Sequence, residues 1–233
     1  MSLENFRYFL KKENKDERTI NDYVSRVEIF LEHINNKKNS IEMVRKQDLI
    51  DFIEELKTTE STPVINRFLF AFSNYFKYIE NQEMYNTTNE LSGQLSIEQY
   101  KIRDFLGINK EDANKLAKLG IRTAQQMIEN GKTVKLRKQL SEESGIPEVT
   151  ILEIVKLSNL ARIGGLKQKR ARLYYESGFD TIEKIANSTP QEIVEIQKQY
   201  VKEHDFDGTA SLLSEAEFSV ELAKYLSRII EYE

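Results

Sequence analysis

A short stretch occurs twice in this chain, at an offset of 58 residues. The copies read GINKEDANKLAKLGIRTAQQMI from Gly107 and GLKQKRARLYYESGFDTIEKIA from Gly165. Each copy has a glycine turn, a short helical segment with an inward alanine, a second glycine turn and a threonine that can cap another helix. The chain must therefore accommodate a duplicated helical unit. A turn that presents N–H groups at a helix N-terminus is also suited to binding phosphate.

The remaining segments also have helical period, and no alternating strand pattern is present. The apolar series that start at Ile20 and Ile65 both continue at +3, +4, +7, +10, +11 and +14. This identical spacing gives each helix one apolar stripe that faces a shared core. The sequence therefore predicts an all-α protein. We expect an N-terminal four-helix bundle, a duplicated helical domain and a C-terminal amphipathic helix.

Composition predicts four segments along the chain. The N-terminal bundle occupies residues 1–83, a linker 84–95, the duplicated domain 96–204 and an acidic C-terminal helix 205–233. The polar stretch NQEMYNTTNELSGQ marks the boundary between the two domains. Beyond it, helices are expected near 96–105, 110–119, 123–130, 135–144, 147–162, 167–177, 181–187 and 190–203.

Several classes of function are disfavoured by composition. The chain has no cysteine, which excludes disulfides and thiolate metal sites and fits a reducing compartment. The two histidines, His33 and His204, do not stand in ligand or catalytic spacing. No apolar run approaches the ~20 residues of a membrane span. We expect a cytoplasmic protein with no membrane segment, no metal and no cofactor.

The net charge of −4 is unevenly distributed. Residues 91–160 hold 11 Lys and Arg against 9 Asp and Glu, and residues 161–204 hold 8 against 6. Residues 205–233 hold 2 against 7. The duplicated region is thus the basic part of the chain, and this permits an anionic partner such as DNA.

The N-terminal bundle carries the pattern of a known family. The stretch ERTINDYVSRVEIFLEHI, followed by DLIDFIEEL and TPVINRFLFAFSNYFKYIEN, resembles the core-binding domain of tyrosine recombinases, the phage integrases. The family motif that begins the last helix of this domain is matched at Thr62, Pro63, Asn66, Arg67, Leu69 and Phe76. The resemblance covers roughly residues 3–83 and implies a helical domain that clamps duplex DNA.

In that family the starts of the second and fourth helices approach the DNA. The resemblance therefore implies contacts by Arg18, Thr19, Asn66 and Arg67. Recombinases carry a catalytic domain with an Arg, a His-x-x-Arg and a nucleophilic Tyr, whereas this sequence contains no His-x-x-Arg. We therefore expect no catalytic residue, and a protein that holds DNA without cutting it.

The second half, roughly residues 96–200, resembles helix-hairpin-helix domains, in particular an uncharacterised tandem type with relatives in DNA-repair and junction-processing proteins. In such motifs a Gly-hydrophobic-Gly hairpin joins two helices, and its amides hold a DNA phosphate without reading base sequence. The resemblance implies DNA contacts by Gly107 and Lys110 in the first copy and by Gly165 in the second.

Both copies depart from the motif at the second hairpin glycine, which is Asn109 in the first copy and Lys167 in the second. The departure predicts either a reshaped turn or a direct phosphate contact by Lys167. The second copy concentrates cations within eleven residues without an acid, namely Arg162, Lys167, Lys169, Arg170 and Arg172. In the first copy Lys110 stands beside Glu111 and Asp112. Charge therefore favours the second copy as the DNA contact, through Lys167, Lys169, Arg170 and Arg172.

Other interpretations remain open at this stage. The repeat glycines are also explained by helix stacking, and the cationic cluster by a solvated helix face. The chain could be a helical protein-interaction module without DNA binding, including a homodimer formed through the apolar stripe of the C-terminal helix. A third hypothesis is an accessory subunit that acts beside a separate catalytic recombinase.

Overall fold

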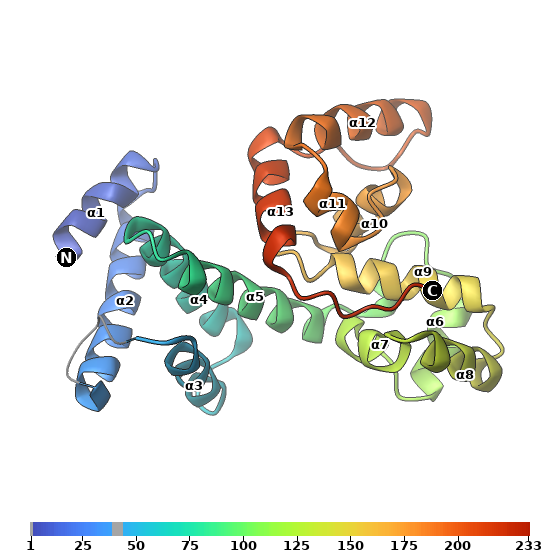
Figure 1. Cartoon of the computed structure of the whole chain (residues 1–233), viewed down its shortest axis with the longest axis horizontal. Helices are drawn as coiled ribbons and strands as arrows, with labels where there is room; N and C mark the ends of the chain where they lie inside the picture. Colours follow the sequence, from blue (N-terminus) through green and yellow to red (C-terminus); the bar gives the residue numbers. More distant parts are fainter. Residues whose placement is uncertain (1, 39–43) are drawn as a thin grey trace. The chain divides into compact units, whose positions relative to one another are not determined.

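A computed structural model describes residues 2–38 and 44–233 and confirms the all-α class. These residues contain no β-strand, only an isolated antiparallel bridge between Lys101 and Thr123. The chain divides into two compact units, residues 1–92 and 93–233, which we call the N-terminal and C-terminal units. Figure 1 shows the helices of each unit.

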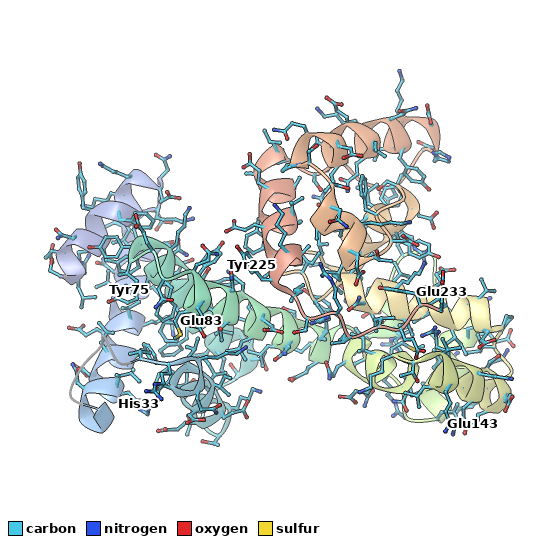
Figure 2. All side chains as sticks on the ribbon, in the orientation of Figure 1. His33, Tyr75, Glu83, Glu143, Tyr225 and Glu233 are labelled. Atoms are coloured by element: carbon cyan, nitrogen blue, oxygen red, sulfur yellow. The ribbon has the colours of Figure 1, made fainter. Side chains whose placement is uncertain are left out.

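The N-terminal unit is built around α2 and α4, which pack on each other. Its helices are α1 (Leu3–Lys12), α2 (Glu17–Lys38), α3 (Lys46–Lys57), α4 (Thr62–Tyr78) and the first part of α5 (Gln82–Gln99). The apolar stripes of α2 and α4 meet through aromatic rings. The ring centroid of Phe30 lies 4.8 Å from that of Phe72 in α4 and 5.2 Å from that of Phe52 in α3. Tyr75 of α4 extends this core toward α1, where it packs edge-on against Phe6 (Figure 2).

The segment expected to be a linker is helical, because α5 runs through it from Gln82 to Gln99. Its polar side chains bind backbone carbonyls one turn back within the helix. Thr88 Oγ1 donates to the Met84 carbonyl at 2.7 Å, and Asn89 Nδ2 donates to the Tyr85 carbonyl at 3.0 Å. Because these bonds satisfy polar groups locally, a stretch that composition suggests is a loop is stable as a helix. The helix expected near 96–105 is replaced by the end of α5 and a short 3₁₀ helix, η2 (Ile102–Asp104).

The C-terminal unit contains the duplicated stretch. Its helices are α6 (Lys110–Lys118), α7 (Ala124–Gly131), α8 (Val134–Ser144), α9 (Glu148–Leu160), α10 (Gln168–Glu176), α11 (Ile182–Asn187), α12 (Pro190–Glu203) and α13 (Leu213–Tyr225). The helices expected between residues 110 and 203 match these within about two residues, the usual uncertainty of helix ends. The C-terminal helix expected over 205–233 is shorter, since α13 covers only Leu213–Tyr225. α9 lies at the centre, against α7, α8 and α10.

The apolar stripe of the C-terminal helix is used within the chain. α13 packs on α11 and α12, which buries Leu222 and Ala223. Beyond α13, the tail returns to α8, where the Val134 N–H donates to Glu231 Oε2 at 3.2 Å. Burial raises the pKa of Tyr232 in this tail to about 12. Tyr225, at the end of α13, remains half exposed (Figure 2).

Gly93 of α5 allows a close approach of two segments of the C-terminal unit. A Cβ at this position would collide with the backbone carbonyl oxygen of Arg162. In a solvent-exposed helix, glycine to alanine stabilises by about 1 kcal/mol. We expect Gly93→Ala to destabilise the protein instead, with a loss of about 1–3 kcal/mol in the free energy of unfolding. The reason is that the backbone at Arg162 or in α5 must move to make room for the Cβ.

Urea unfolding followed by far-UV circular dichroism measures this difference. The exposed neighbour Gln94 provides the control, since Gln94→Ala changes the same helix without meeting Arg162. A stabilising effect of Gly93→Ala would show that α5 and the end of α9 do not approach each other.

Candidate nucleic-acid interface

The two copies of the repeated stretch have the same local structure. α6 and α10 begin at Lys110 and Gln168, which preserves the offset of 58 residues. Each is preceded by a glycine with positive φ, +78° at Gly107 and +87° at Gly165. We call residues 105–109 the first turn and residues 163–167 the second turn. The inward alanines, at Ala113 and Ala171, are both buried, as the repeat predicts.

The second turn does not need a left-handed residue where the motif has its second glycine. Lys167 has φ −69° and ψ 171°, an extended conformation that any residue adopts. It is exposed and precedes α10 without a side-chain cap. Gly165 is also exposed, but the Leu166 and Lys167 N–H groups donate to the Ile163 and Gly165 carbonyls, each at 3.0 Å. The Lys167 side chain, rather than these amides, is therefore the group available to an external anion.

Two cations of α10, just after the second turn, bind α13 and the segment that leads into it. Lys169 Nζ lies 2.8 Å from Asp207 Oδ2, with both side chains at least half exposed. Arg170 Nη1 donates to the Thr209 carbonyl at 2.8 Å, and its Nη2 lies 3.3 Å from Glu215 Oε2. The acidic C-terminal part of the chain therefore neutralises much of the charge that favoured this copy.

Arg172, which the sequence predicts as a DNA contact, is instead buried, and its side chain serves the fold. Its Nε donates to the Leu106 carbonyl at 2.6 Å. Its Nη2 and Nη1 donate to Glu153 at 2.7 Å and Glu176 at 2.9 Å. These bonds tie the second copy to the first turn and leave the guanidinium no exposed face for DNA. Arg162 is similarly buried, with Nη1 on Asn159 Oδ1 and the Ser227 carbonyl.

In the first turn, local groups occupy part of the expected phosphate position. Asn109 Oδ1 accepts the Glu111 N–H at 2.7 Å and so caps α6. Gly107 faces the Arg172 guanidinium, whose atoms would lie 3.3 Å from a Cβ there. Gly107 is thus favoured by its positive φ, and a Cβ there would also press on this guanidinium, which is a structural explanation. Lys110 is exposed at the first position of α6.

The sequence prediction omitted cations that the fold exposes around the first copy. Lys101, Lys118 and Arg122 are exposed, and none forms a salt bridge with a described residue. These three residues lie outside the first turn and are not part of the helix-hairpin-helix motif. Comparison of the copies position by position does reveal one of them, because Arg122 corresponds to Asp180.

At the start of α2, Arg18 and Thr19 have different roles. Arg18 is exposed. Thr19 is engaged locally, since its N–H and Oγ1 donate to the Asp16 carboxylate at 2.9 and 2.8 Å. The backbone and side-chain bonds from Thr19 lower the pKa of Asp16. A phosphate near this helix start would meet that carboxylate, so Arg18 is the stronger candidate of the two.

At the start of α4 the N-cap is Ser61, one residue before the Thr62 of the motif, and Pro63 lies in the first turn. Arg67 is exposed. Asn66 is half-buried, and its Oδ1 is buried without a hydrogen-bond donor among the described residues.

The two predicted pairs are separated along the bundle, because the start of α4 lies near the middle of α2. The Arg26 guanidinium, in the middle of α2, lies 4.6 Å from the Phe68 ring centroid near the start of α4. The end of α4 instead meets the α1–α2 region, where Lys77 Nζ is 3.5 Å from Glu13. Arg18 and Arg67 therefore do not form one cluster. They mark two separate cations on one unit.

Asp180 holds two lysines together in the C-terminal unit. Its Oδ2 is 2.6 Å from Lys156 Nζ, and its Oδ1 is 2.6 Å from Lys184 Nζ. Burial alone would raise the pKa of Asp180, but the hydrogen bonds from Lys156 and Lys184 outweigh it and the pKa is lowered. A lowered pKa in the folded state stabilises the fold above the unfolded value of about 3.9. This stabilisation is lost as the pH falls through the folded pKa.

We therefore expect Asp180→Asn to lower the free energy of unfolding at pH 7 by about 1.5–3 kcal/mol, as for hydrogen bonds to charged groups. As the pH falls through the folded pKa, the stabilities of variant and wild type should converge, because the wild-type carboxylate is then protonated. Urea unfolding at a series of pH values measures both. A difference that persists at acid pH would attribute the effect to packing rather than charge.

The described residues contain no helix long and apolar enough to cross a bilayer. In the same residues, no group of three or more His, Cys, Asp or Glu side chains could hold a metal ion.

Comparison with known proteins assigns both halves of the chain. Residues 3–83 match the model of the phage integrase N-terminal SAM-like domain. Residues 106–226 match the model of a domain of unknown function, DUF4332. No curated protein and no solved structure matches the chain.

The protein is thus an all-α chain with an integrase-type N-terminal domain. Because the second match covers more than half of its residues, the chain belongs to the DUF4332 family. The integrase match confirms the resemblance predicted for residues 3–83. It relates the chain to recombinases and makes DNA the first ligand to test.

Proposed function

We propose that this protein binds DNA without catalysing a reaction on it, and that it is related to site-specific recombinases. The observation that carries the proposal is the integrase N-terminal match over residues 3–83. Domains of this type clamp duplex DNA in recombinases, and the N-terminal unit is a helical bundle.

Two exposed cations support backbone contact by this unit. Arg18 stands in the first turn of α2 and Arg67 in the second turn of α4, near the helix starts that the integrase resemblance places near DNA. Arginine binds phosphate through paired N–H groups, and such contacts carry no base information. The affinity should accordingly be electrostatic and weakly dependent on sequence.

The absence of catalysis is part of the proposal. The sequence has no His-x-x-Arg, which is part of the catalytic set of recombinases. We propose that the chain holds DNA, alone or beside a separate recombinase. Incubation with supercoiled plasmid and magnesium tests this, since nicked or relaxed product would contradict it.

A charge-reversal pair tests the DNA contact. We expect Arg18→Glu/Arg67→Glu to weaken binding of a labelled duplex at least about tenfold at ~50 mM salt. The log–log salt slope should become shallower by about one unit per lost contact. Fluorescence anisotropy measures both quantities.

The matched control is Lys12→Glu/Lys77→Glu, which makes the same charge change at exposed positions of the same unit. The control should weaken binding much less. Equal losses in the two variants would show that only overall charge matters and would remove the assignment to Arg18 and Arg67.

The second candidate function is a protein-interaction module. It is favoured by exposed apolar side chains around α13, since Leu212 is 68% exposed and Tyr225 is 50% exposed. The apolar stripe of α13 is buried within the unit, so a homodimer would have to use these remaining side chains. Sedimentation equilibrium over a range of protein concentrations tests for this homodimer, and a constant monomer mass would exclude it.

A further inference from the structure

A cationic hollow lies on the first copy of the repeat, outside the first turn. It has a volume of about 330 Å³ and opens between η2, α6 and the residues before α7. Its lining is Lys101, Ile102, Arg103, Ala113, Asn114, Ala117, Arg122 and Thr123. The lining thus combines apolar side chains with three cations and contains no acid. Arg103 Nε, however, lies 3.7 Å from Oδ1 of the adjacent Asp104, which leaves Lys101 and Arg122 as the two cations without an ion pair to a described residue.

The hollow continues along α6 into a more open depression that shares Asn114, Ala117 and Arg122 with it. This second part adds Lys118. It also adds Glu111 and Lys115, and Lys115 lies within 3.7 Å of both Glu111 and Asp112 and is largely neutralised by them.

Backbone hydrogen bonds fix the cations around the hollow. The Ile102 N–H donates to the Arg122 carbonyl at 3.0 Å, and the Ala124 N–H donates to the Tyr100 carbonyl at 2.8 Å. The Arg122 N–H also donates to Gln126 Oε1 at 2.8 Å. The backbones that carry Lys101, Arg103 and Arg122 are therefore held together before any ligand arrives, which reduces the entropy lost on binding.

The second copy provides an internal comparison at the same positions. Asn114 and Ala117 correspond to Arg172 and Tyr175, and Arg122 corresponds to Asp180. The Arg172 guanidinium lies 5.3 Å from the Tyr175 ring centroid. Large side chains therefore stand where the first copy has small ones.

The charge at this place also differs between the copies. Asp180 is paired with Lys156 and Lys184, whereas Arg122 has no salt bridge to a described residue. The second copy is filled and neutral at this place, and the first is open and positive. A purely structural role, which both copies share, does not account for this difference in side chains and charge.

We propose that this hollow binds the phosphate of a nucleotide, with the cations on the phosphate and the apolar side chains against the sugar or base. Guanidinium groups match phosphate geometry, and ligand pockets typically combine an apolar lining with a few polar groups. As a contact to a DNA strand, the site rests on the function proposed above. A free mononucleotide is the other source of the same chemistry.

Two variants test the hollow by different physical means. Lys101→Glu/Arg122→Glu reverses its charge. Ala117→Tyr introduces the side chain of the second copy and fills the hollow without changing charge. The control is Lys135→Glu/Lys138→Glu, which makes the same charge change on exposed positions of α8. Circular dichroism establishes that each variant is folded. If Ala117→Tyr is not folded, the charge variant Lys101→Glu/Arg122→Glu alone decides whether the hollow binds a nucleotide.

The probes are a labelled duplex, a labelled single strand and AMP, each titrated at ~50 mM salt, where phosphate contacts are strong. We expect both hollow variants to lose at least about tenfold in affinity for a strand, and the control to stay within about threefold. Strand binding that is unchanged in both hollow variants overturns the site and leaves the proposed function standing. A third outcome is that the wild type binds AMP but no DNA, and that Ala117→Tyr abolishes AMP binding. This outcome supports the site and contradicts the proposed function. No binding of any probe by the wild type overturns both.

Discussion

Replacing Arg172 by alanine should lower the free energy of unfolding of the C-terminal unit by about 3–5 kcal/mol, the range for breaking a buried ion pair. The Arg172 side chain is 6% exposed, and it lies 2.7 Å from Glu153 and 2.9 Å from Glu176. Its Nε also holds the Leu106 carbonyl of the first turn. Alanine would leave these acceptors without their donor and would open a cavity between the two copies.

Chemical unfolding of Arg172→Ala measures this loss, and Lys169→Ala is the control. Lys169 stands on the same helix in an exposed ion pair, which contributes about 0–1 kcal/mol. A double-mutant cycle with Glu153→Gln isolates the coupling between Arg172 and Glu153. A loss below about 1 kcal/mol for Arg172→Ala would show that Arg172 is solvated, and would restore it as a candidate DNA contact.

Phe30→Ala should destabilise the N-terminal unit by about 3–5 kcal/mol, because a large buried ring is lost and the neighbours only partly close the cavity. Phe30 is 1% exposed, and its ring meets Phe52, Phe72 and Phe76 at centroid distances of 5.2, 4.8 and 6.5 Å. It therefore joins α2 to both α3 and α4.

Native-state amide exchange measures this effect separately in each unit. The adjacent Ile29 is 45% exposed, so Ile29→Ala should change stability by no more than about 0.5 kcal/mol. Because the chain divides into two compact units, Phe30→Ala should leave the protection of residues 93–233 unchanged. Equal loss of protection in both units would contradict that division.

Much of the fold could be predicted from the sequence, because local signals determine it. The identical spacing of apolar residues after Ile20 and Ile65 predicted α2 and α4, and the glycine–threonine punctuation predicted the ends of α6 and α10. α5 was not predicted. Its threonines and asparagine are turn formers by propensity, and only their bonds to carbonyls of the preceding turn make them compatible with a helix.

The site was less predictable, because the state of a cation depends on partners distant in sequence. Arg170 meets Thr209 and Glu215, and Arg172 meets Leu106 and Glu153. A local charge count cannot reveal such pairs. The contrast between Arg122 and Asp180 was visible in the aligned copies, but its meaning depends on the hollow that the fold forms around Arg122.

The most direct test of DNA binding is the salt dependence of wild-type affinity for a labelled duplex. Titrations between ~50 and ~200 mM salt give log Kd against log salt concentration. We expect a linear relation with a slope of about three units or more, since each neutralised phosphate contributes about 0.9. Absence of binding at ~50 mM salt, or an affinity independent of salt, would contradict the proposal that this protein holds the DNA backbone.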